Sequence, residues 1–249
     1  MRFALPFAVM TALAAPAAAL DLDAMTDAER NAFGENVRSY LMENPQVLME
    51  VIAVLEQQQA DAAAMTDQTL VQVNAEALFD DPNSWVGGNP EGDVTIVEFL
   101  DYRCGFCKRA HPAVNELVGS DGNIRVIVKE FPILGEQSVM ASRFAVATRQ
   151  IAGDDAYAAV SDALMAMRGE VSPASLGRLA EVLEIDYAEI ETVMMSDDVT
   201  AILQANRALG DRMQITGTPT FVFGDQLVRG FVELPQMQGI VEELRASQG

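Results

Sequence analysis

Two cysteines separated by two residues constrain this chain more than any other feature of its sequence. Cys104 and Cys107 are the only cysteines among 249 residues, with a glycine and a phenylalanine between them. The apolar, β-branched run 94–100 is typical of a buried strand, and residues 108–118 are typical of a helix. Cys104 is therefore expected at a helix N-terminus, where free N–H groups and the helix dipole stabilise a thiolate.

The two positions predict different roles in disulfide exchange. Cys104, ahead of the first helical turn, is expected to be accessible and to act as the nucleophile. Cys107, one turn further on, is expected to be more buried and to resolve a mixed disulfide by closing the ring. A zinc site is disfavoured because the chain has no second cysteine pair and only one histidine. A purely structural disulfide is disfavoured because so small a loop constrains the unfolded chain little.

The first residues resemble a bacterial secretory signal peptide. Arg2 precedes an apolar run at 3–13, and the small residues at 17–19 predict cleavage after Ala19. The run is too short to favour a membrane span. We therefore expect an exported, periplasmic protein, since disulfides persist in that compartment. The net charge of −21 disfavours nucleic acid and anionic lipid as partners.

Helical periodicity fills residues 20–80, which we expect to form an N-terminal helical arm. Thr26 and Glu29 have the spacing of a capping box at its start. The apolar positions form narrow stripes, and such a stripe must pack on another surface. Self-association is favoured over docking within the chain. The methionines of the arm are interpreted as apolar packing rather than as a copper site.

Residues 81–249 are predicted to form one α/β domain. Residues 83–93 contain three glycines and a proline, which predicts a loop. A second core strand is expected at 124–131. Helical periodicity from 136 to 213 predicts an all-helical insertion, and turn residues after 220 predict a hairpin followed by a closing helix.

Further candidates for the site lie on either side of the cysteines. Glu98 is expected to point inward from the preceding strand, where burial would raise the pKa of its carboxyl group and let it exchange a proton with Cys107. An exposed glutamate at the strand edge is the alternative. Lys129 or Glu130 is expected to approach Glu98 from the second strand. His111 is interpreted as structural, with tuning of the thiols as the alternative.

Thr218 and Pro219 stand just before the strand expected at 221–223. The residues alone favour an ordinary trans turn proline at this place. A cis bond would keep the loop sharp and expose backbone groups beside the thiols. Both conformations stay open at this point.

The order of these features resembles the thioredoxin-fold DsbA family. Residues 97–107, Val-Glu-Phe-Leu-Asp-Tyr-Arg-Cys-Gly-Phe-Cys, are close to its signature, and the similarity covers roughly residues 80–247. Residues 40–48, Tyr-Leu-Met-Glu-Asn-Pro-Gln-Val-Leu, resemble the N-terminal domain of the suppressor-of-copper-sensitivity C proteins. Those proteins are periplasmic and DsbA-like, and some are oligomeric through that domain.

The resemblance implies an α/β thioredoxin fold with an inserted helical domain, preceded by an N-terminal helical oligomerisation arm. It implies no cofactor and no metal. It assigns roles to five residues: the nucleophile Cys104, the resolving thiol Cys107, the cis-proline Pro219, the buried acid Glu98 and its partner Lys129. Thr218, just before the proline, is a sixth candidate residue of the site.

One departure separates this chain from the DsbA oxidases, which carry Pro-His between their cysteines. Phe106 cannot give a thiolate the contacts that the histidine gives, so we expect a less oxidising pair. Gly105-Phe106, together with Thr218 before the proline, resembles the disulfide isomerases instead. The sequence therefore favours an isomerase or reductase over the first alternative, a DsbA-like dithiol oxidase. A Cu(I)-binding protein that uses both thiolates is a less favoured alternative.

The resemblance also implies partners. Misfolded or disulfide-containing exported proteins are the expected substrates, and a membrane redox partner is expected to recycle the cysteines. Residues 20–80 are expected to join copies of the chain, with a trimer favoured.

Overall fold

The computed structural model of the chain describes residues 25–248, so the signal peptide predicted at 1–19 lies outside the described residues. The strands are β1 (Trp85–Gly88), β2 (Val94–Leu100), β3 (Ile124–Glu130), β4 (Thr220–Phe223) and β5 (Gln226–Arg229). The helices are α1 (Asp27–Glu43), α2 (Gln46–Val73), α3 (Ala75–Phe79), α4 (Gly105–Asp121), α5 (Glu136–Ala152), α6 (Asp154–Ala166), α7 (Pro173–Val182), α8 (Tyr187–Met194), α9 (Asp197–Arg212) and α10 (Leu234–Gln248).

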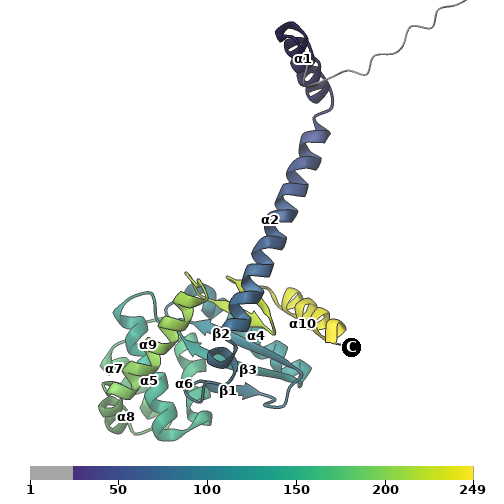
Figure 1. Ribbon diagram of the computed structural model, residues 1–249. Coiled ribbons are helices and arrows are strands. Elements are labelled where there is room, and N and C mark those ends of the chain that lie inside the picture. Colours follow the sequence, from purple (N-terminus) through teal and green to yellow (C-terminus); the bar gives the residue numbers. More distant parts are fainter. Residues whose placement is uncertain (1–24, 249) are drawn as a thin grey trace, which may run out of the picture. The chain divides into compact units, whose positions relative to one another are not determined.

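The five strands form one mixed sheet in the order β1-β3-β2-β4-β5 (Figure 1). β2 and β3 run parallel at its centre, and the other three pairings are antiparallel. The helices α5 to α9 are inserted between β3 and β4. This is a thioredoxin fold with a helical insertion, so the predicted fold class is confirmed.

The two faces of the sheet bury different side chains because residues alternate along each strand. Ile96 and Leu100 face a core to which α4, α10 and the insertion contribute. Val97 and Phe99 face the opposite side, where the end of α2, α3 and the end of α9 pack. The alternation decides which polar residues of β2 and β3 can meet the cysteines on α4.

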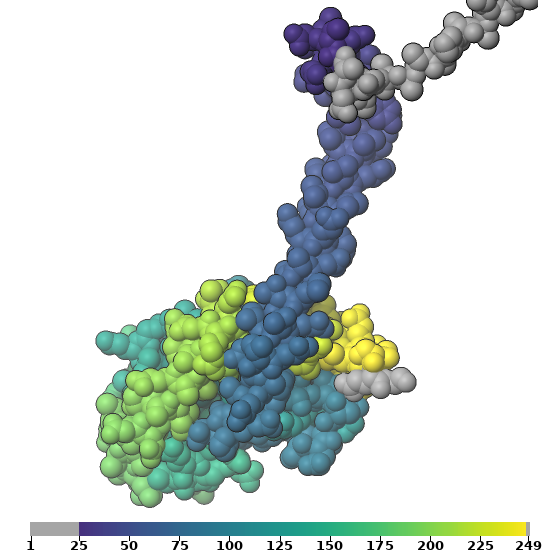
Figure 2. Space-filling model, in the orientation of Figure 1, coloured from purple at the N-terminus to yellow at the C-terminus, as the bar shows by residue number. Residues whose placement is uncertain are grey.

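The chain divides into two compact units, and the boundary falls between Gln58 and Gln59, inside α2. The boundary predicted at 80/81 therefore differs from the structure, since residues 59–80 belong to the second unit. The reason is that Val71 and Leu78 are buried in the same apolar core as Phe99. Figure 2 shows the last turns of α2, in blue, lying beside α9, in yellow-green.

The first unit presents its apolar side chains to solvent. Its opening capping box is present, since Glu29 N donates to Thr26 Oγ1 (3.3 Å) and Thr26 N donates to Glu29 Oε2 (2.9 Å). No residue of α1 is buried. The exposed large apolar residues on α1 and the first part of α2 are Phe33, Val37, Tyr40, Met42, Leu48, Met49, Val51, Ile52, Val54 and Leu55. Across residues 25–248, no helix combines the length and the apolarity needed to cross a membrane.

Strand β1 lies where the sequence predicted only a loop. Trp85-Val86-Gly87-Gly88 has no strand pattern, but it pairs with β3 from Trp85 opposite Val128 to Gly88 opposite Arg125. The Trp85 ring stacks on Tyr157 with 5.5 Å between ring centroids. A Cβ atom at Gly87 would stand 2.0 Å from the Trp85 ring, so the glycine makes room for it. Tertiary packing rather than local propensity forms this edge strand.

Candidate active site

Cys104 stands at the N-cap of α4, as predicted, with an extended backbone. Its N–H donates to Asp101 O (3.0 Å), and its carbonyl accepts from Lys108 N (3.1 Å), the first bond of the helix. The remaining N–H groups of the first turn have no partner within the helix. The helix dipole there favours a thiolate over a neutral group.

The loop at Thr218-Pro219 covers Cys104. The Thr218–Pro219 bond is cis, as the resemblance implied and contrary to what the residues alone favoured. The Cys104 thiol donates to Thr218 O at 3.1 Å. Cys104 is only 7% exposed, so the accessible nucleophile expected from the sequence is instead covered by this loop. Pro219 is held in turn, because its carbonyl accepts from Gly230 N (2.9 Å).

Cys107 is fully buried one turn into α4. Burial raises the pKa of its thiol well above the ordinary range, and the negative charges of Glu98 and of Cys104 as a thiolate raise it further. Both cysteines are free thiols in this structure. Cys107 is therefore a poor nucleophile until a nearby base removes its proton.

Glu98 supplies a buried carboxyl group beside Cys107. It is 2% exposed, and its Oε1 atom has no hydrogen-bond partner. Burial, and to a lesser extent the charge of Glu130, raise the pKa of Glu98 to about 8. The inward position predicted from the sequence is confirmed, and a carboxyl group with such a pKa can take up or release a proton near neutral pH. Its part in proton transfer stays a proposal.

Lys129 is not the partner of Glu98. Glu98 lies opposite Val128 in the register, and Lys129 lies opposite Phe99, so the side chains of Glu98 and Lys129 point to opposite faces of the sheet. Lys129 is 1% exposed, and its Nζ donates to Asp81 Oδ2 (2.8 Å) and Ala77 O (2.7 Å). The partnership implied by the resemblance is thus wrong, and the Lys129 side chain is buried on the opposite face of the sheet instead.

Glu130 is the charged residue of β3 that shares the face of Glu98. Its Oε1 atom accepts from Tyr102 Oη (2.7 Å) and Tyr157 Oη (2.6 Å). Burial raises the pKa of Glu130 to about 7, although these hydroxyl groups oppose the shift. Of the two residues of β3 that were expected to approach Glu98, it is therefore Glu130 and not Lys129 that shares its face of the sheet.

Asp101 connects the cysteine loop to the loop after β3, and the sequence did not single it out. The residue is buried. Its Oδ1 accepts from Arg103 N (2.7 Å), and its Oδ2 accepts from Ile133 N (2.9 Å) and Leu134 N (3.1 Å). An aspartate just after a strand is a common turn residue, but the second loop comes from a much later segment of the chain, which no local pattern can reveal.

The surface next to Cys104 combines aromatic rings with a cation. Phe106 is 56% exposed at the start of α4. The Arg109 guanidinium lies 5.8 Å from the Phe106 ring centroid and 4.4 Å from that of Phe231. Such a partly apolar surface beside a nucleophile suits contact with unfolded polypeptide.

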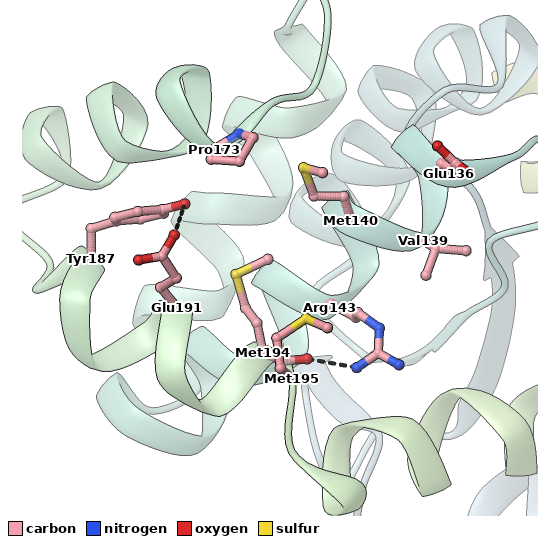
Figure 3. A pocket seen from close by; sticks show the side chains of 9 residues that line it. All are labelled: Glu136, Val139, Met140, Arg143, Pro173, Tyr187, Glu191, Met194 and Met195. Atoms are coloured by element: carbon pink, nitrogen blue, oxygen red, sulfur yellow. Dashed lines mark hydrogen bonds between the residues drawn. The ribbon is translucent and has the colours of Figure 1, made fainter.

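A separate cavity of about 480 Å³ lies within the helical insertion (Figure 3). Three methionines, Met140, Met194 and Met195, line it together with residues of α5, α7 and α8. Arg143 closes one side by donating to Met194 O (2.6 Å), and Tyr187 Oη lies 3.3 Å from Glu191 Oε1. Neither cysteine lines this cavity. Among residues 25–248, no three His, Cys, Asp or Glu side chains are grouped so that they could hold a metal ion.

Comparison with known families agrees with this geometry. The DSBA-like thioredoxin domain matches residues 95–242. The N-terminal domain of the copper resistance protein ScsC matches residues 29–62. The first match contains both cysteines and the Thr218–Pro219 loop, and the second contains most of the first unit.

Several solved structures share this fold. A thioredoxin-like oxidoreductase from Silicibacter pomeroyi is 43% identical, with a TM-score of 0.65 over 69% of this chain and 97% of that one. ScsC from Proteus mirabilis, in a transitional conformation, is 28% identical, with a TM-score of 0.66 over 91% and 100%. The thiol-disulfide exchange protein α-DsbA2 from Wolbachia pipientis is 26% identical, with a TM-score of 0.69 over 74% and 98%.

Two curated relatives are much longer proteins. Na⁺/H⁺ antiporter NhaA 1 of Salinispora arenicola is 31% identical over 158 residues, and NhaA 3 of Salinispora tropica is 28% identical over 162 residues. The matched segments cover 63% and 65% of this chain but only 24% and 25% of the antiporters. The chain thus spans about a quarter of the length of these relatives, and ion transport is a property of those proteins.

Proposed function

Because this chain belongs to the DSBA-like thioredoxin domain family, we propose that it is a periplasmic thiol-disulfide oxidoreductase that reduces and rearranges disulfides in exported proteins. The observation that carries the proposal is the pairing of two unlike thiols. Cys104 lies at a helix N-terminus under the Thr218–Pro219 loop, and Cys107 is fully buried beside Glu98. In such a pair, one sulfur attacks the client disulfide and the other resolves the mixed disulfide.

Reduction of a client disulfide follows from this arrangement in two steps. The Cys104 thiolate attacks one client sulfur, the client S–S bond breaks, and the second client sulfur leaves as a thiolate. Cys107 then loses its proton and attacks Cys104 Sγ, which releases the first client sulfur. The client disulfide is reduced to two thiols, and the two cysteines are oxidised to a disulfide. In isomerisation the freed client thiolate attacks a different client disulfide before Cys107 acts.

The residues between the cysteines favour reduction and isomerisation over oxidation. Gly105 has no side chain, and the side chain of Phe106 has no hydrogen-bond donor that could stabilise the Cys104 thiolate. A less stabilised thiolate makes the reduced form less favoured and the disulfide a weaker oxidant. The exposed Phe106 ring beside Arg109 adds a surface that suits unfolded clients.

The first unit supports self-association. Its exposed apolar residues on α1 and the first part of α2 have no partner surface of their own in that unit. Contact with further copies of the chain, three in the favoured assembly, would bury them and place several redox sites around one client. A membrane redox partner that returns the cysteines to the dithiol form completes the proposed cycle.

Reactivation of ribonuclease with scrambled disulfides tests the proposal. We expect the mature chain from Leu20 to reactivate it, and a chain that starts at Gln59 to retain reduction of small disulfides but lose most of the reactivation. The cut falls at Gln59, not near residue 80, because Val71 and Leu78 belong to the core of the second unit. If neither chain reactivates the ribonuclease but both oxidise a reduced substrate, the protein is a dithiol oxidase.

Two cysteine variants separate the roles of the thiols. Cys104→Ser should abolish turnover and trap no client. Cys107→Ser should accumulate mixed disulfides with clients, because attack continues without resolution. Equal turnover by Cys104→Ser and the wild type would refute the mechanism. Equilibration of the wild type with glutathione gives the direction, and a strongly oxidising pair would favour the oxidase.

A further inference from the structure

A second cavity, of about 300 Å³, lies between the sheet, α4 and α6. β2 contributes Glu98 to its wall, α4 contributes His111 and Asn115, and α6 contributes Ser161 and Asp162. Polar groups at both ends and a volume of several water molecules, about 30 Å³ each, make this a cavity that water can fill. Disulfide exchange between the sulfur atoms assigns no role to this cavity.

The inner end of the cavity is the carboxyl group of Glu98. Its unpartnered Oε1 atom is an acceptor within a residue that is 2% exposed. An unpaired buried carboxyl oxygen is costly unless it serves a function or contacts water. Among the titratable groups around it, Cys107 of α4 and Glu130 of β3 interact electrostatically with Glu98, and Tyr157 of α6 lines the same cavity. β4 adds the apolar Phe221 opposite it.

The outer end of the cavity is a histidine–aspartate pair. His111 Nε2 lies 2.6 Å from Asp162 Oδ1, and Asn115 Nδ2 lies 3.3 Å from the same nitrogen. His111 is partly buried, whereas the Asp162 side chain is mostly exposed. Imidazole is the side chain best suited to pass protons near neutral pH. No Lys or Arg is among the described residues that line this cavity, so His111 is its one basic group.

We propose that this cavity is the route by which the proton of Cys107 leaves the buried site, from Glu98 through water to the His111–Asp162 pair and then to solvent. The inference rests on the proposed function and deepens it. When Cys107 attacks Cys104 Sγ, its proton passes to the Glu98 carboxylate, and the client sulfur leaves as a thiolate with the electron pair of the broken bond. Glu98 returns to its carboxylate by passing that proton outward, and His111 releases it.

In this route His111 and Asp162 act on the resolving step indirectly, as positioning residues that pass the proton from Glu98 to solvent. His111 does not touch a reacting sulfur, because its contacts are Asp162 and Asn115. The equilibrium between dithiol and disulfide is unaffected by the route a proton takes. The rate of resolution, by contrast, depends on that route whenever the solution offers few other proton acceptors.

The test measures resolution of a preformed mixed disulfide between Cys104 of the full mature chain and a fluorescent peptide. In weakly buffered solution, His111→Ala should slow resolution about tenfold, which is modest beside the ~10²–10⁴-fold typical of direct general acid–base catalysis. Added imidazole should restore the rate. The glutathione equilibrium of the variant should equal that of the wild type.

Matched variants keep the proposal falsifiable. Asp162→Asn should slow resolution less than His111→Ala, and Asp155→Asn, the same charge change on α6 outside the cavity, should have no effect. His111→Gln keeps a hydrogen-bonding side chain that does not pass protons, so a full rate in this variant would overturn the proposal. Slowing of His111→Ala by the same factor with and without imidazole would also overturn it. Failure of the proposed function looks different, since the wild type would then not exchange disulfides at all.

Discussion

Two buried carboxyl groups, Glu98 and Glu130, lie on the sheet face that packs against Cys107. Glu130 Oε1 accepts from Tyr102 and Tyr157, whereas Glu130 Oε2 and Glu98 Oε1 have no hydrogen-bond partner. The mutual repulsion of like charges raises the pKa of Glu98 beyond what burial alone achieves. The folded protein therefore holds a proton on Glu98 at pH values where the unfolded chain has released it.

This difference predicts a pH-dependent stability that Glu98→Gln removes. Glu98 has a pKa of about 8 when folded and an ordinary value of 4.5, so the folded state binds more protons between these values. Its contribution is fully present below pH 4.5 and is lost as pH rises through 8. Relative to Glu98→Gln, the reduced wild type should lose a few kcal/mol over this range, since each tenfold change in proton affinity corresponds to about 1.4 kcal/mol.

Urea unfolding of the reduced protein between pH 5 and pH 9 measures the effect. Glu91→Gln, at an exposed glutamate of the same domain, is the matched control and should follow the wild type. A constant difference between the wild type and Glu98→Gln at every pH would show that Glu98 does not titrate in this range.

Asp101 predicts a second effect at the scale of single residues. Asp101→Ala would leave three backbone N–H groups without their acceptor, at Arg103, Ile133 and Leu134. We expect a loss of about 3 kcal/mol, since each lost bond to a charged acceptor costs roughly 1.5–3 kcal/mol and water can replace part of it. Asp101→Asn keeps one acceptor oxygen and should lose less, which chemical denaturation measures. Equal losses in the two variants would contradict this explanation.

At the scale of elements, the end of α2 and α3 complete the core on the sheet face opposite the cysteines. Val71 and Leu78 pack there against β2 and β3, and Arg212 Nε donates to Asn74 Oδ1 (2.7 Å). Asp67 accepts from Arg229 through both carboxylate oxygens, at 2.6 and 2.9 Å. These contacts make the last turns of α2 part of the catalytic unit.

The Lys129–Asp81 pair predicts an asymmetry between its two partners. Asp81→Asn removes the negative charge beside a lysine that is almost fully buried, and an uncompensated buried charge costs about 3–5 kcal/mol. Lys129→Met removes the buried charge and keeps much of the volume, so it should cost less. Urea unfolding of both variants at neutral pH tests this, and a greater loss in Lys129→Met would contradict it.

The strands and helices that carry the cysteines could be predicted because their signals are local. β-branched residues mark β2, and the cysteines follow it directly. β1 could not be predicted, since Trp85, Gly87 and their neighbours become a strand only through pairing with β3. The true partner of Lys129 could not be predicted, because neither strand sequence determines the register between β2 and β3. A shift of one residue in that register moves every side chain of a strand to the other face of the sheet. His111 and Asp162 are fifty-one residues apart, and no local pattern joins them.

At the scale of the whole molecule, the exposed apolar residues of the first unit predict an oligomer. Charged side chains introduced among these residues should dissociate it. Leu48→Glu combined with Ile52→Glu places two carboxylates one turn apart among them, where burial in an interface would be costly. Analytical ultracentrifugation should show the wild type as an oligomer and the double variant as a monomer. Gln58→Glu, on the same helix, is the control and should leave the assembly intact. A monomeric wild type would refute self-association through the exposed apolar residues of the first unit.

The contact between Cys104 and Thr218 joins residues that are 114 positions apart in the sequence. During synthesis, Cys104 is therefore made well before the residue that covers it. A chain made from its N-terminus presents its cysteine pair well before the segment that covers it exists. Until residue 218 has emerged, Cys104 lacks the loop that covers its thiol in the folded protein. A chain shortened to end before Thr218 should therefore be alkylated at Cys104 faster than the complete protein, and equal rates would show that the loop does not protect the sulfur. The segment that covers Cys104 is thus synthesised late, and a chain that stops before Thr218 carries the thiol without its covering loop.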